Sequence, residues 1–156
     1  MGDPELSVLE EQERRLVFER FDNNTAWELG TLMVGAARER GLPVVVSIER
    51  NGQRLFHAAL PGTAADNDAW VERKVRVVRR YGRSSYQVGC HFRAEGGTFE
   101  EKSRLDPNEY AAHGGAFPLT IRGVGVVGSI TVSGLPQAED HAFVVEQIER
   151  FLTDQP

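Results

Sequence analysis

A histidine followed by two glycines, at positions 113 to 115, is the sequence feature best suited to chemistry. Two glycines expose backbone N–H groups and leave room for a ligand to approach the chain. A neutral imidazole such as that of His113 can bind a metal ion or a haem iron. On spacing alone the alternative is a turn in which the histidine hydrogen-bonds a backbone carbonyl, and the spacing favours this alternative.

A strongly basic stretch is the second candidate. Its cationic residues are Arg73, Lys74, Arg76, Arg79, Arg80 and Arg83, and Ser84, Ser85 and Tyr86 follow directly. Arginine forms paired hydrogen bonds with phosphate and carboxylate groups, so the stretch could bind an anion. The alternative is a solvated helix face, or ion pairs with acidic residues of a neighbouring subunit.

Two other motifs are weaker evidence for a functional site. Residues 123–128 match G-x-G-x-x-G, but nucleotide binding requires that pattern to follow a strand and open a helix. Residues 129–133 continue as a strand, which predicts a bent or bulged hairpin instead. Cys90 and His91 are adjacent and would point to opposite faces of an extended chain, and their apolar neighbours indicate a buried thiol. We therefore expect no thiol catalysis.

The spacing of the histidines argues against a metal site. The chain has four, at positions 57, 91, 113 and 141. None are four residues apart and no H-E-x-x-H is present, so we predict no metal centre. Asp140 and His141 are adjacent at a helix start, and together with His113 they supply the minimum for acid–base catalysis. Spacing does not show that these three converge, and no recognised catalytic motif accompanies them.

Composition bounds the class of protein. The chain has 156 residues and a net charge of -5, with 23 acidic and 18 basic residues. An acidic chain gains little from counterion release, so we expect no nucleic-acid partner. No apolar run approaches the ~20 residues that cross a bilayer, and the acidic start does not resemble a signal peptide. The single cysteine excludes an intramolecular disulfide. We expect one cytoplasmic domain over residues 1–156.

The elements that must position these residues follow from hydrophobic periodicity and turn signals. Helices are expected over residues 5–15, 26–40, 66–81 and 136–152, and strands over 44–50, 54–60, 117–122 and 124–132. Asn51-Gly52 is a strong signal for a tight hairpin turn. Residues 22–25 are expected to cap the second helix, with Thr25 and Glu28 at capping-box spacing.

Three segments are less clear from sequence. Residues 16–21 fit a short strand or the end of a helix, and residues 84–92 fit either state. Residues 94–107 are polar and predict a long surface excursion, followed by a turn of helix. Two hairpins with intervening helices predict an α+β fold, with a central, mostly antiparallel sheet and helices packed on it.

Several blocks in order carry a family resemblance. Residues 21–30 read FDNNTAWELG, and residues 61–63 read PGT ahead of Asp66-Asn67, Trp70 and Arg73-Lys74. Residues 84–86 read SSY and residues 112–118 read AHGGAFP. The glycine-rich 123–128 segment, residues 132–137 (VSGLPQ) and Asp140-His141 complete the pattern. Over residues 9–152 the chain resembles the HbpS-like haem-degrading superfamily, in its branch of small cytosolic proteins.

The resemblance implies a profilin-like domain with a central antiparallel sheet and a homo-oligomer built from dimers. The superfamily also includes the protein of the glycolate operon and the C-terminal domain of PduO. Some relatives bind haem, so the resemblance makes haem a candidate cofactor. A eukaryotic relative is linked to chaperone traffic of tail-anchored proteins.

Our first hypothesis is therefore a small-ligand-binding protein, with haem or a related small anionic molecule as the ligand. The expected pocket is formed by His113, Gly114, Gly115 and Phe117. His113 would be the axial ligand or a polar anchor, and Phe117 would stack on an apolar ring. Arg73 and Lys74 would pair with propionate carboxylates.

Two alternatives stay open. One is an oligomeric interaction or adaptor protein without chemistry, in which glycine-rich strands and an apolar helix form a subunit interface. The other is a small enzyme that uses Asp140, His141 or His113 as acid or base. The sequence leaves the presence of any catalysis undecided.

Overall fold

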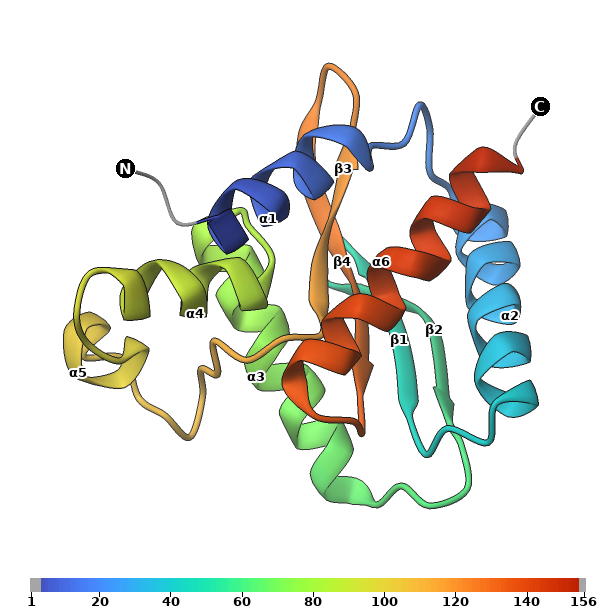
Figure 1. The fold of residues 1–156 in the computed structure, drawn as a ribbon. Helices are drawn as coiled ribbons and strands as arrows, with labels where there is room; N and C mark the ends of the chain where they lie inside the picture. Colours follow the sequence, from blue (N-terminus) through green and yellow to red (C-terminus); the bar gives the residue numbers. More distant parts are fainter. Residues whose placement is uncertain (1–3, 155–156) are drawn as a thin grey trace.

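A four-stranded antiparallel sheet lies between two layers of helices in the computed structural model, which describes residues 4–154 (Figure 1). The strands are β1 (Val45–Arg50), β2 (Gln53–Ala59), β3 (Ala116–Ile121) and β4 (Gly125–Ser133), and their order in the sheet is β2-β1-β4-β3. The helices are α1 (Pro4–Arg15), α2 (Asn23–Glu39), α3 (Ala65–Tyr81), α4 (Ser85–Ala94), α5 (Phe99–Ser103) and α6 (Gln137–Thr153). The expected α+β fold is confirmed.

The alternation of side chains along the strands sorts the sheet into two different faces. Val46 and Ile48 of β1 lie in the main apolar core, which packs against α2 and α6. Val45 points the other way and contacts Val71 and Val75 of α3. The α3 face of the sheet is mostly polar, although it is buried, and carries Ser47, Glu49, Ser129, Thr131 and Ser133.

The turn between β1 and β2 forms where the sequence predicts it. Asn51 and Gly52 both have positive φ, 51° and 83°, as a primed hairpin turn requires. The β3–β4 hairpin also forms as expected, and the glycine-rich residues 123–128 lie in its turn and in β4 rather than at a helix start.

Helix α2 begins earlier than expected, at Asn23. Asp22 is the N-cap: its Oδ1 accepts from the Thr25 backbone N–H at 2.9 Å. Thr25 Oγ1 accepts in return from the Asp22 N–H at 3.1 Å. The capping box is thus formed by Asp22 and Thr25, and the expected pairing of Thr25 with Glu28 was one turn too late.

Three segments that the sequence left open are now defined. Residues 85–94 form α4, capped by the Ser84 hydroxyl, which accepts from the Gln87 N–H. The polar excursion contains α5, whose Phe99 is buried against α3 and α4. Residues 16–21 form neither a helix nor a full strand. Their one contact of strand type is a parallel bridge from Phe18 to Ile121 at the β3 edge. Among the described helices none has the length and apolarity to cross a membrane.

Candidate functional site

A polar pocket of about 290 Å³ lies where the first turns of α3 and α6 meet the end of β4. We call it the Lys74 pocket. Its walls are Asp66, Asn67, Trp70, Lys74, His113, Ser133, Gly134, Leu135, Gln137 and Asp140. Three separate stretches of sequence supply these residues, so the site exists only in the folded chain.

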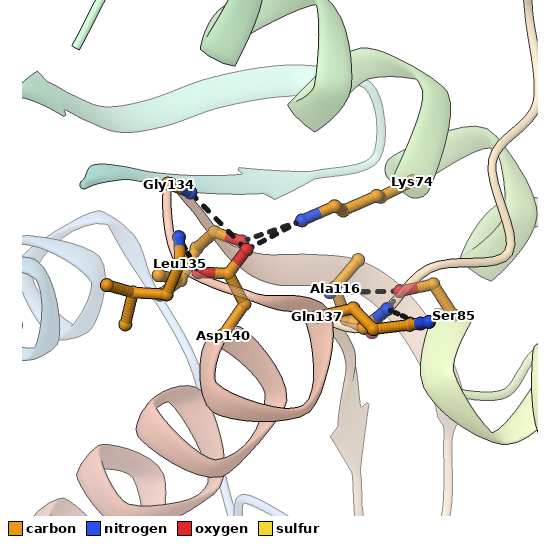
Figure 2. Close-up of polar contacts among 9 residues, drawn as sticks. Lys74, Ser85, Ala116, Gly134, Leu135, Gln137 and Asp140 are labelled. Atoms are coloured by element: carbon orange, nitrogen blue, oxygen red, sulfur yellow. Dashed lines mark hydrogen bonds and ion pairs between the residues drawn. The ribbon is translucent and has the colours of Figure 1, made fainter. Parts of the chain in front are cut away.

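An ion pair between Lys74 and Asp140 forms one wall of the pocket (Figure 2). Lys74 Nζ donates to Asp140 Oδ2 at 3.1 Å and to the Val132 carbonyl at 3.2 Å. The Asp140 carboxylate also accepts from the backbone N–H groups of Leu135 at 2.9 Å and Gly134 at 3.3 Å. The carboxylate is thereby fixed by the turn between β4 and α6.

Burial acts on both members of this pair. Their side chains are only 3% and 2% exposed. Burial lowers the pKa of Lys74, although the Asp140 charge opposes that shift. Burial likewise raises the pKa of Asp140, against the opposing effect of Lys74 and of the hydrogen bonds from Leu135 and Gly134. Both shifts favour the neutral forms, because a low-dielectric site penalises charge.

The two glycines of the His-Gly-Gly sequence are explained by close packing against neighbouring atoms. A Cβ on Gly115 would lie 2.7 Å from Lys74 Nζ and 2.3 Å from the Val132 carbonyl, and its φ is +136°. A Cβ on Gly114 would lie 2.2 Å from the Gln137 carbonyl oxygen, and the Gly114 N–H donates to Gln137 Oε1 at 3.1 Å. These glycines make room for Lys74 and the start of α6.

His113 is half-buried and lines the pocket. Burial is the main reason that its pKa lies below the usual value, and the nearby Lys74 adds to the effect. Within residues 4–154 no hydrogen bond joins either ring nitrogen to another residue. The expected turn in which this histidine bonds a carbonyl is therefore not what forms. A neutral imidazole with an available lone pair faces the pocket.

Trp70 is the aromatic wall of the site. Its ring lies 5.1 Å from the His113 ring, centroid to centroid, and the Arg73 guanidinium lies over its face at 3.9 Å. Phe117 was the residue expected to stack on the ligand. That ring is fully buried, because in β3 it points to the α6 side of the sheet, where the main core lies. It cannot reach a ligand in the Lys74 pocket.

The remaining expected residues divide as follows. Lys74 and His113 line the pocket, whereas Arg73 lies beside it on Trp70 and donates to the Pro107 carbonyl at 3.4 Å. Asp140 lines the pocket but the adjacent His141 does not. His141 is buried on another side of α6, where Nε2 contacts Gln12 Oε1 at 2.8 Å. Asp140, His141 and His113 therefore do not converge on one site.

Sequence reasoning missed Trp70, Gln137 and the partnership of Lys74 with Asp140. One signal was available: Lys74 lies three residues after Val71 and four before Val78, on the apolar stripe of α3. A lysine at such a position is buried, and a buried lysine requires an acidic partner. The sequence gives no distance to that partner, which lies 66 residues away.

The basic stretch and the cysteine have structural partners. Arg76 donates to the Glu109 carbonyl at 3.1 Å and Arg79 pairs with Glu49 at 3.4 Å. Cys90 is buried in α4, and Arg93 donates to its sulfur at 3.1 Å. Among the residues that the structure describes, no three His, Cys, Asp or Glu side chains gather as a metal site.

Comparison with known proteins gives the family. Residues 21–149 match the family model described as haem degrading protein HbpS-like, which is most of the chain. The chain belongs to the HbpS-like family. The match begins just before α2 and ends within α6, so it includes every wall of the Lys74 pocket.

Relatives of known sequence and structure agree with this assignment. A UPF0303 protein of Streptomyces coelicolor is 67% identical over 149 residues, covering 96% of this chain and 94% of that one. The crystal structure of the Ybr137w protein has a TM-score of 0.88 at 35% identity, covering 98% and 90%. HbpS has a TM-score of 0.66 at 21% identity (85% and 90%), and PduOC, in a complex with haem, 0.67 at 19% (85% and 94%). The last two show a shared fold.

Proposed function

We propose that this protein binds a small ligand in the Lys74 pocket, with His113 as the group that contacts it. The observation that carries the proposal is the half-buried His113 ring, which lines the pocket and has no hydrogen-bond partner within residues 4–154. Buried polar side chains normally find partners in the folded chain, so a partly buried ring without one is suited to a ligand. Trp70 beside it provides a flat apolar surface for a planar group.

Haem is the candidate that we favour. Iron is bound by the neutral form of imidazole, which burial favours for His113. Arg73, held over Trp70, is a cation that could pair with a propionate. Lys74 is less suited to that role, because Asp140 already neutralises it. Small-molecule pockets usually enclose ~300–1,000 Å³, so this pocket, at about 290 Å³, would hold only the part of a tetrapyrrole next to His113, and the rest would lie outside it. The family name and the PduOC complex support the same ligand.

A hemin titration of the tag-free protein tests this proposal, with the Soret band as the readout. We expect a saturable shift at one hemin per chain, lost in His113→Ala. His91→Ala is the matched control, because His91 lies on α4, outside the pocket, with its Nε2 3.8 Å from a Glu10 carboxylate oxygen. A shift that survives unchanged in His113→Ala would remove His113 from the role, and no saturable shift would reject haem.

Assembly through the β2 edge is a second candidate function, favoured by one exposed tryptophan. Trp27 of α2 is 65% exposed and contacts Phe56 of β2 edge to face at 5.9 Å. β2 is an edge strand, and its last five residues, Leu55 to Ala59, carry no fixed charge or proline to discourage pairing. The other edge, β3, is bridged by Phe18. We propose that a second copy of the chain covers Trp27 and the β2 edge, which gives the homo-oligomer built from dimers.

Light scattering after size exclusion tests this assembly. We expect a dimer or a larger oligomer that Trp27→Ala converts to monomer. Val124→Ala is the matched control, because Val124 is 69% exposed on the β3–β4 turn, away from β2. A wild-type monomer at high protein concentration, or equal assembly of Trp27→Ala and wild type, would reject this interface. For location we propose the cytoplasm, since a single cysteine is typical of a reducing compartment.

A further inference from the structure

The chain contains only two lysines among its 18 basic residues, and they lie in opposite environments. Lys102 is exposed on α5, whereas the Lys74 side chain is 3% exposed and lines the pocket. Arginine, which the chain uses at its other basic positions, keeps its proton under all ordinary conditions and is not a nucleophile. Lysine can lose its proton, so a buried lysine at a pocket wall brings a chemistry that arginine cannot.

The surroundings of Lys74 Nζ favour that chemistry. An ammonium group has three N–H donors, and Nζ donates to two acceptors in the described chain, Asp140 Oδ2 and the Val132 carbonyl. One position on the nitrogen is thus left for a ligand. Asp140 lies 3.1 Å away and is held by the Leu135 and Gly134 N–H groups, so it can take a proton from the amine without moving (Figure 2). The opposed shifts of the two groups favour a neutral amine beside a carboxylic acid.

We propose that the Lys74 amine forms an imine with a small aldehyde or keto acid held in the Lys74 pocket. The nitrogen lone pair attacks the carbonyl carbon, and the new C–N bond forms as the C=O π electrons move to oxygen, which takes the proton of the Asp140 carboxylic acid. The nitrogen then gives one of its protons to the Asp140 carboxylate. Asp140 passes this proton to the hydroxyl, which leaves as water as the C=N bond forms, and the iminium nitrogen gives its remaining proton back to Asp140. The sum is amine plus carbonyl giving imine plus water, with no oxidant or reductant.

The pocket selects the class of carbonyl compound. Its volume of about 290 Å³ admits only a small molecule. The Trp70 and His113 rings accept a planar group. Ser133 and Gln137, which line the pocket from the end of β4 and the start of α6, offer polar contacts. The inference uses the pocket that the proposed function assigns to a ligand, but it does not require that haem binds there.

Reductive trapping tests the inference. The full-length protein is incubated at pH 7 with sodium cyanoborohydride and either pyruvate or benzaldehyde, and peptide mapping by mass spectrometry follows Lys74 and Lys102 separately. Amines of free lysine are almost fully protonated at pH 7, so an ordinary lysine reacts slowly. We expect at least one probe to modify Lys74 tenfold or more faster than Lys102, and the ratio to fall at pH 10. Equal rates, or no Lys74 adduct with either probe, would overturn the inference.

Two variants separate this inference from the proposed function. Lys74→Met, checked by circular dichroism for its fold, should lose the fast adduct. Asp140→Asn, checked for its fold in the same way, should slow trapping at Lys74, because it removes the group that transfers protons between nitrogen and oxygen, and it should leave Lys102 unchanged. Trapping that fails while hemin binds through His113 overturns the imine and keeps the ligand pocket. Trapping that succeeds in a protein that binds no hemin overturns haem and keeps the imine, and failure of both overturns both.

Discussion

Replacing Asp140 by asparagine should destabilise the fold strongly, because it removes the acidic partner of a buried lysine. The Lys74 side chain is 3% exposed and its only charged partner in the described chain is Asp140, at 3.1 Å. Removing one member of a buried pair costs about 3–5 kcal/mol. Domains are stable by only ~5–15 kcal/mol, so this loss is a large share of the total. Urea unfolding followed by circular dichroism at pH 7 measures it.

The cost should also depend on pH, in a direction fixed by Lys74. The pKa of Lys74 in the folded chain lies below the ordinary value of 10.5. Between these two values the unfolded chain binds more protons than the folded chain, so the free energy of unfolding rises with pH. Without Asp140 the folded pKa falls further, and the pH range of this rise widens. The stability gap between Asp140→Asn and wild type should therefore narrow between pH 7 and pH 10.

A double variant tests the interaction between Lys74 and Asp140 even if Asp140→Asn does not fold. Replacing both members of a buried pair by apolar residues is often neutral or stabilising, so Lys74→Met with Asp140→Leu should recover most of the loss. An Asp140→Asn cost below about 1 kcal/mol would show that the buried pair does not hold the site together. The same conclusion would follow if the double variant lost as much stability as Lys74→Met and Asp140→Leu lose when their separate losses are added.

Three further predictions concern glycines and buried titratable groups. Gly115→Ala should cost more than about 2 kcal/mol, since its φ is +136° and a Cβ would meet Val132 O at 2.3 Å, whereas Gly35→Ala in α2, with nothing within 4 Å, should gain about 1 kcal/mol. Burial lowers the pKa of His141 to about 4, so wild type should lose up to about 3 kcal/mol relative to His141→Gln as pH falls from 6.5 to 4; equal pH profiles would contradict this. Burial raises the pKa of Glu13 to about 7, so wild type should lose stability relative to Glu13→Gln as pH rises from 4.5 through 7. A stability difference between these two proteins that is the same at pH 5 and pH 8 would refute this. Urea unfolding midpoints measure the effects at the glycines, at His141 and at Glu13.

Local signals predicted the parts of the fold that depend on neighbouring residues. The Asn51-Gly52 turn requires two positive φ values, which few other dipeptides adopt, so the first hairpin could be assigned from sequence. The periodicity of α3 and α6 was equally clear. Helix α4 was not, because its buried face includes Ser85, Gln87 and Gly89, and a polar buried face leaves no hydrophobic period to detect.

The candidate site was predictable only in its chemical types. His113 and Lys74 were chosen for what an imidazole and an amine can do, and both line the pocket. Their surroundings depend on contacts distant in sequence, such as Lys74 with Asp140, which neither spacing nor composition encodes. Phe117 was misplaced for a simpler reason: whether it faces the pocket or the core depends on the strand's register in the sheet, and one residue reverses the answer.

Anomalous diffraction at the iron edge, from crystals grown with hemin, tests the central claim most directly. The claim is that the ligand is bound in the Lys74 pocket by His113. We predict one iron peak per chain, adjacent to the His113 imidazole and bordered by Trp70. Iron bound at His57, at His91 or at any site outside this pocket would contradict the account.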